Sequence, residues 1–123
     1  MAIKQNVRAF VEVTANYFSR LEFYQDCTVE LYSTYLPGAY SILGMELLNI
    51  DIKRGGQTVD KFVFYFDGAG DIDEVWVYGI NKHAIADSCR RSNQLWGLGV
   101  GHISTSLDHV EISISDTSAL CVF

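Results

Sequence analysis

Three side chains in the C-terminal part of the chain could do acid–base or nucleophilic chemistry. Residues 98–106 and 109–115 read as two paired strands, and pairing them places His102 opposite Ser113 and diagonal to Glu111. A catalytic group of this kind also needs an activated nucleophile and oxyanion donors, and no strained nucleophile turn surrounds these residues. We therefore interpret the three side chains as the polar face of a sheet and predict no catalytic residue.

The other patterns that could carry chemistry also fall short of a defined site. The acidic run 67–74 lacks the spacing of a calcium-binding EF-hand loop, so a hydrated hairpin turn is the better interpretation. The glycine-rich segment 97–101 leads into a strand and lacks the Lys-Ser/Thr pair of a phosphate-binding loop. Asp108 and His109 are interpreted as the tip of a loop. The three cysteines form no CxxC motif and have no histidine at zinc-ligand spacing, so we expect free buried thiols at Cys27, Cys89 and Cys121. The sequence thus predicts no metal and no cofactor.

Composition limits the class of protein. The 123 residues fit one domain, predicted to span 1–123, and their net charge is −6 with only nine basic residues, which are scattered. Nucleic-acid binding requires clustered Lys and Arg, so we predict no nucleic-acid partner. No stretch approaches the length of a membrane span, and the N-terminus lacks the apolar region of a secretory signal. We therefore expect a cytoplasmic protein with no membrane partner.

The elements that would position these side chains belong to an α+β fold. The pattern predicts a mainly antiparallel curved sheet with two helices, in the order α-β-β-β-β-α-β-β-β. The predicted helices are 6–22 and 81–94, the second with Asn81 as its cap, and the predicted strands are 27–34, 42–53, 58–67, 72–79, 98–106, 109–115 and 119–123.

Pairing the central strands predicts two apolar faces. A hairpin centred on Gly55-Gly56 sets Leu47 against Phe64 and Leu48 against Val63, and it also sets Asp51 unfavourably against Asp60. The next hairpin sets Phe64 against Val75, Phe62 against Val77 and Val63 against Trp76. One face then carries Met45, Leu47, Phe62, Phe64, Phe66, Val75 and Val77, and the other carries Leu48, Ile50, Ile52, Val59, Val63, Tyr65, Trp76 and Tyr78.

A sheet that is apolar on both faces must be covered on both faces. Two helices cover one face most easily, which leaves the chain's own terminal strands, a second subunit or a ligand for the other. The candidate residues for an interface or a ligand on this second face are Trp76, Tyr78, Tyr65, Val63, Leu48 and Ile50.

We therefore expect a small acidic, non-catalytic binding or interaction protein that self-associates as a homodimer or higher homo-oligomer through this aromatic face. The alternative is an enzyme, or a small-ligand-binding protein, that holds a small apolar molecule in a cavity lined by Tyr and Trp. Its candidate lid is a tyrosine-rich stretch with Tyr32, Tyr35 and Tyr40, and its base would be His102 or an Asp. A third hypothesis, an acidic mimic of nucleic acid, requires carboxylates along one surface, whereas the fifteen acids are dispersed.

The stretch FVFYFDGAGDIDEVWVYGI, residues 62–80, resembles the sheet hairpin of the nuclear transport factor 2-like family. In that family the hairpin lies near the end of the domain, whereas here a predicted helix and three predicted strands follow it. No acid–base pair of that family can be placed on this sequence. The resemblance therefore implies only that a pocket-bearing protein is an alternative to the interaction protein.

Overall fold

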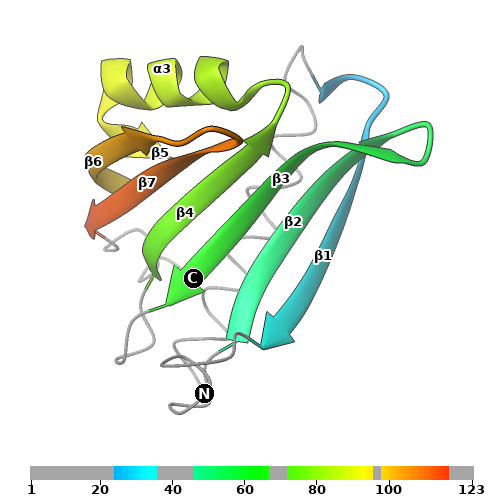
Figure 1. Ribbon diagram of the computed structural model, residues 1–123, viewed down its shortest axis with the longest axis horizontal. Helices are drawn as coiled ribbons and strands as arrows, with labels where there is room; N and C mark the ends of the chain where they lie inside the picture. Colours follow the sequence, from blue (N-terminus) through cyan, green and yellow to red (C-terminus); the bar gives the residue numbers. More distant parts are fainter. Residues whose placement is uncertain (1–23, 36–45, 67–71, 96–97, 117–123) are drawn as a thin grey trace.

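Seven strands form one antiparallel sheet in the computed structural model, which describes residues 24–35, 46–66, 72–95 and 98–116 (Figure 1). The strand order across the sheet is β1-β2-β3-β4-β7-β6-β5. The elements are β1 (Thr28–Tyr35), β2 (Glu46–Arg54), β3 (Gln57–Phe66), β4 (Ile72–Gly79), α3 (Lys82–Ser92), β5 (Gln94–Leu95), β6 (Leu98–Thr105) and β7 (His109–Asp116).

The connection through α3 decides which strands meet at the centre of the sheet. Strands β1 to β4 follow one another as a meander, and α3 then packs over the end of the sheet that holds β4 to β7 (Figure 1). The chain returns so that β7, the last strand described, lies between β4 and β6 and pairs with both. Residues far apart in the sequence, on β4 and β7, are therefore direct neighbours.

The prediction of two helices is wrong for the residues that the structure describes, which contain one α-helix, α3. Their order is β-β-β-β-α-β-β-β, and the sheet-rich class holds. The predicted helix 6–22 and the predicted strand 119–123 lie outside the described residues. Within 24–116 the described chain also has a strand that the pattern did not predict, β5.

Strand β5 exists because α3 ends earlier than predicted. Asn93 adopts the left-handed conformation (φ 56°, ψ 27°), which asparagine tolerates better than most residues, and its N–H donates to the carbonyl of Cys89. The helix therefore stops at Ser92, and Gln94–Leu95 is free to pair with β6. At the other end Asn81 precedes the helix as predicted, but its side chain makes no capping hydrogen bond.

The core lies on one face of the sheet and beneath α3. Alternation along the strands brings large apolar side chains to this face, and the helix adds Ile85, Ala86 and Cys89. Among the described residues, none of the helical segments has the length and apolar character of a membrane span. The fully buried side chains of the sheet include Ile50, Ile52, Phe62, Phe64, Phe66, Val75, Val77, Val110 and Ile112.

The register between β3 and β4 is the predicted one, but the register between β2 and β3 is not. Val63 pairs with Trp76 and Phe64 with Val75, which confirms the second hairpin. In the first hairpin, however, Leu48 pairs with Phe64 instead of Val63. A β-bulge at Val59 accounts for the change, because it adds one residue to β3 opposite β2.

This bulge overturns part of the predicted second face. Ile50 now pairs with Phe62, so Ile50 and Ile52 are core residues, 1% and 0% exposed, and not candidates for an interface. The bulge also removes the predicted clash of carboxylates, since Asp51 pairs with Lys61. The face opposite the core is therefore not uniformly apolar.

Candidate functional site

The face of the sheet opposite the core carries a three-by-three array of side chains across β3, β4 and β7. Trp76 is at its centre, paired with Val63 on β3 and with Glu111 on β7. The array follows from period-two alternation, which sends every second residue away from the core. Its three rows are Lys61–Tyr78–His109, Val63–Trp76–Glu111 and Tyr65–Glu74–Ser113.

Four rings of this array contact one another in a row, and we call them the aromatic strip: Tyr65, Trp76, His109 and Tyr78. The ring of Trp76 lies 4.5 Å from that of His109, nearly parallel at 17°, and 4.8 Å from that of Tyr65. Tyr78 stacks on His109 at 4.9 Å. All four side chains are partly exposed, whereas their neighbour Val63 is only 5% exposed. The strip is thus a packed cluster of rings whose edges reach the surface.

The indole of Trp76 has a second constraint. Its Nε1–H donates to Glu74 Oε1 at 2.7 Å, along the same strand. This contact holds the plane of the indole and satisfies its polar group, so the ring can stay partly exposed in one orientation.

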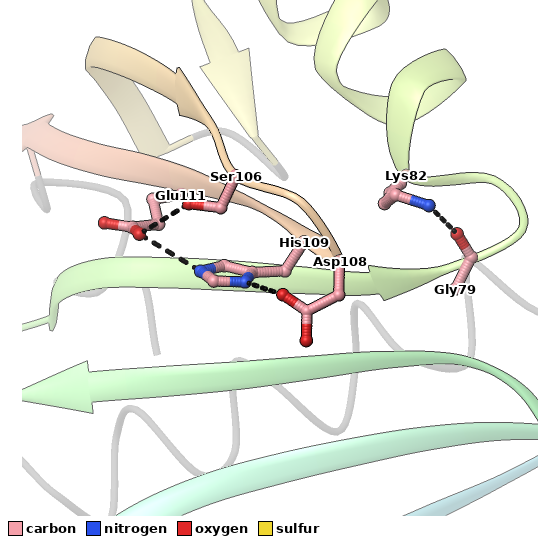
Figure 2. A network of polar contacts seen from close by, with 6 residues as sticks. All are labelled: Gly79, Lys82, Ser106, Asp108, His109 and Glu111. Atoms are coloured by element: carbon pink, nitrogen blue, oxygen red, sulfur yellow. Dashed lines mark hydrogen bonds and ion pairs between the residues drawn. The ribbon is translucent and has the colours of Figure 1, made fainter.

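His109 links the strip to two carboxylates (Figure 2). Its Nδ1 lies 2.8 Å from Asp108 Oδ1, and its Nε2 lies 3.0 Å from Glu111 Oε2. Ser106 Oγ donates to the same Glu111 oxygen at 3.2 Å. The side chain of His109 is 12% exposed, whereas that of Asp108 is 77% exposed. The network therefore joins a largely covered imidazole to a carboxylate at the surface.

These contacts shift the ionisation of the cluster. Burial acts to lower the pKa of His109, but the hydrogen bonds and charges of Asp108 and Glu111 outweigh it and raise that pKa above the usual value. The hydrogen bond with His109 lowers the pKa of Asp108. Burial raises the pKa of Tyr78, with Asp108 adding to the effect and Lys61 opposing it. The array favours a positive imidazolium between two negative carboxylates.

A shallow groove of about 440 Å³ borders the strip beside Tyr78. Val59 and Val63 supply apolar surface, and Lys61 supplies a positive group. The remaining lining comes from Thr58, Asp60 and Gly79. The groove is open to solvent, unlike the enclosed cavity that the enzyme alternative requires.

The predicted polar cluster forms around a different histidine. His102 is opposite Ser113, as predicted, and exposed, but Glu111 contacts His109 and Ser106. His109 is the first residue of β7, as the predicted strand 109–115 implies, and its ring packs between Trp76 and Tyr78, so its interpretation as no more than a loop tip is wrong. A signal was present in the sequence: His109 and Glu111 are two residues apart on a strand and must share a face.

The other predicted site residues divide into three groups. Trp76, Tyr78, Tyr65 and Val63 lie together on the array, as the second hairpin predicted. Leu48 and Ile50 do not belong to it, for the reason given above. Tyr32 and Tyr35 lie in the part of β1, residues 31–35, where only the backbone is described, and Tyr40 lies outside the described residues. Within the described part of the chain, no group of three or more His, Cys, Asp or Glu side chains could hold a metal ion.

A buried carboxylate near the start of β3 has no signal in the sequence pattern. Asp60 is 0% exposed and accepts hydrogen bonds from the backbone N–H of Asn81 at 3.0 Å and from its side-chain amide at 2.7 Å. Burial raises the pKa of the neighbouring Tyr24, and Asp60 raises it further. These contacts tie the bulge of β3 to the turn that starts α3, which is a structural role.

Comparison with known proteins yields no relative: no family model, no curated protein and no solved structure matches this chain. The resemblance of residues 62–80 to the nuclear transport factor 2-like hairpin therefore gains no support. Function has to be argued from the array itself.

Proposed function

We propose that this protein is a non-catalytic interaction protein that self-associates through the aromatic strip. The observation that carries the proposal is the position of Trp76, which is partly exposed within the aromatic strip on the face of the sheet opposite the core. Clustered aromatic side chains at the surface are typical of the residues that contribute most to protein–protein binding.

The arrangement of His109 favours binding over catalysis. Both of its ring nitrogens are within hydrogen-bonding distance of a carboxylate, Asp108 or Glu111, so neither is directed at a substrate. A general base must reach the proton that it removes. The neighbouring groove is also open to water.

The distribution of charge favours a second copy as the partner. Lys61 lies on the β3 side of the array, and Asp108 and Glu111 lie on the β7 side. In a face-to-face dimer whose twofold axis runs parallel to β4, the β3 side of one copy lies over the β7 side of the other. Lys61 of each copy would then approach Asp108 of the other, while the two Trp76 side chains meet near the axis.

The first experiment measures mass against concentration by sedimentation equilibrium. We expect the wild type to exceed the 13.8 kDa of a monomer at micromolar concentration, and Trp76→Ala to weaken association by at least ~2 kcal/mol, about thirtyfold. The matched control is Leu107→Ala, since Leu107 is an exposed apolar residue in the β6–β7 turn. A monomeric wild type, or equal loss in both variants, would refute the proposal.

A second experiment tests the twofold arrangement. Lys61→Glu and Asp108→Lys should each associate poorly, because each homodimer then contains two like-charge contacts. Mixing the two variants restores opposite charges at both contacts, so the mixed dimer should be about tenfold tighter than either homodimer at low salt. Native mass spectrometry separates the three species. A mixture that forms no excess of mixed dimer contradicts this arrangement.

The groove beside Tyr78 supports a second candidate, the binding of a small apolar molecule. In that case Tyr78→Ala, which removes a side chain that lines the groove, keeps the mass of the wild type and loses only the binding of an apolar fluorescent probe such as anilinonaphthalene sulfonate.

A further inference from the structure

The polar network of His109 is built into the same surface that we propose for association. The imidazole ring is in the middle of the strip, stacked on both Trp76 and Tyr78, and its two nitrogens reach Asp108 and Glu111. Any change in the contacts of this ring must therefore change the packing of the strip.

The two protonation states of His109 differ in the contacts that they allow. An imidazolium donates a hydrogen bond from each nitrogen and so satisfies both carboxylates. A neutral imidazole has one donor, which leaves a lone pair facing one carboxylate. It also loses the attraction between a cation and the faces of Trp76 and Tyr78. The neutral ring is therefore expected to separate from one carboxylate and to loosen the stack.

We propose that protonation of His109 switches this surface: the imidazolium orders the aromatic strip and favours association, and the neutral imidazole releases it. The inference rests on the proposed function only for its effect on association, since the ordering of the strip is a property of one chain. Association should then be tightest at mildly acidic pH and weaken as the pH rises through the neutral range.

The charged and titratable groups around His109 favour this direction. The β6–β7 turn contributes Asp108, β7 contributes Glu111, and β4 contributes Glu74 through its hydrogen bond to Trp76. Lysines oppose them: Lys82 of α3 acts on Asp108, and Lys61 of β3 acts on Tyr78. In the proposed dimer, Lys61 of the second copy also lies over the row of His109 and competes with the imidazolium for Asp108, so the switch requires the ordering of the strip to outweigh this repulsion. Asp108 and Glu111 are in direct contact with the imidazole, whereas Glu74 and the lysines act through other residues.

The first test follows the strip in a single chain. The indole N–H signal of Trp76 in a nuclear magnetic resonance titration, identified by its loss in Trp76→Phe, should shift with the same midpoint as the ring protons of His109. That midpoint should lie above the ordinary histidine value of about 6.5. The measurement is made at a concentration where the mass is that of a monomer, so it does not depend on association.

Glu111→Gln is the informative variant, because an amide can donate to or accept from the imidazole in either protonation state. The pH-dependent shift of Trp76 should then be clearly smaller than in the wild type, because only the charge of the stacked ring and its contact with Asp108 still change with pH. His102→Gln, an exposed position on the neighbouring strand, should retain the full shift. A Trp76 signal that does not follow the titration of His109, or a shift that is undiminished in Glu111→Gln, would overturn the switch.

The second test measures association at pH 5.5 and pH 8.5. We expect the association constant of the wild type to be about tenfold or more lower at pH 8.5 than at pH 5.5, because one bound proton per chain favours the complex. The association constant of Glu111→Gln should change little between the two pH values. If the wild type is monomeric at both values, the proposed function fails while the first test still decides the switch. If it associates equally at both values, the switch does not control association.

Discussion

Replacing Gly79 with alanine tests the local geometry that joins β4 to α3. Gly79 has a φ of +119°, a conformation that residues with a side chain rarely adopt. A Cβ at this position would also overlap the carboxylate oxygen of Asp60 and the carbonyl oxygen of Val59, and would lie 2.6 Å from Asp60 Cα. Asp60 is buried and bonded to Asn81, so it cannot move aside without losing those contacts.

The expected loss of stability has two parts. Forcing an L residue into this backbone conformation costs about 1–3 kcal/mol. Displacing Asp60 leaves the two N–H groups of Asn81 without their acceptor, which costs about 1–3 kcal/mol more. Gly79→Ala should therefore lower the free energy of unfolding by about 4 kcal/mol.

The assay is urea denaturation at neutral pH, with Gly56→Ala as the matched control. Gly56 also has a positive φ, +83°, but a Cβ there meets nothing within 4 Å. The control should lose only the backbone part, about 1–2 kcal/mol. Equal losses in the two variants would show that Asp60 is not held rigidly against Gly79, and the reasoning would fail.

Three further outcomes can be checked on the same protein. Asp60→Ala should cost about 3 kcal/mol in urea denaturation, and a double-mutant cycle with Asn81→Ala should reveal strong coupling; additive losses would contradict the hydrogen bonds. The pKa of His109 is higher in the folded protein than in the unfolded chain, where it is about 6.5. The contribution of His109 to stability is therefore fully present below the pKa of the unfolded chain and is lost as the pH rises through the pKa of the folded protein. His109→Gln should therefore destabilise the protein more at pH 5.5 than at pH 9 by thermal unfolding, and a constant difference would contradict this sign. Burial raises the pKa of Cys89 to about 11, so iodoacetamide at pH 8 should label Cys89 far more slowly than the partly exposed Cys27, as measured by peptide mapping. Equal labelling of the two cysteines would mean that the core around Cys89 opens to solvent.

The sequence could predict which residues belong to the candidate site only where the strands that carry them are consecutive in the chain. Tyr65, Trp76 and Tyr78 are predicted on one face because β3 and β4 are consecutive strands and successive side chains of a strand point to opposite faces. Ile50 was placed wrongly because the bulge at Val59 leaves no mark in the alternation of either strand. His109 was missed because its aromatic neighbours are on β4, which is separated from β7 by α3, β5 and β6.

The strand-rich class, the β3–β4 register and the common face of Tyr65, Trp76 and Tyr78 can be predicted from the residues alone, since all three follow from local periodicity and short turns. The position of β7 beside β4, which brings an imidazole with two carboxylates among the rings, is known only from the folded chain. The same is true of the pairing of Asp51 with Lys61 instead of Asp60. Both depend on the summed energies of pairing and packing between distant segments, and no single stretch of the chain encodes those energies.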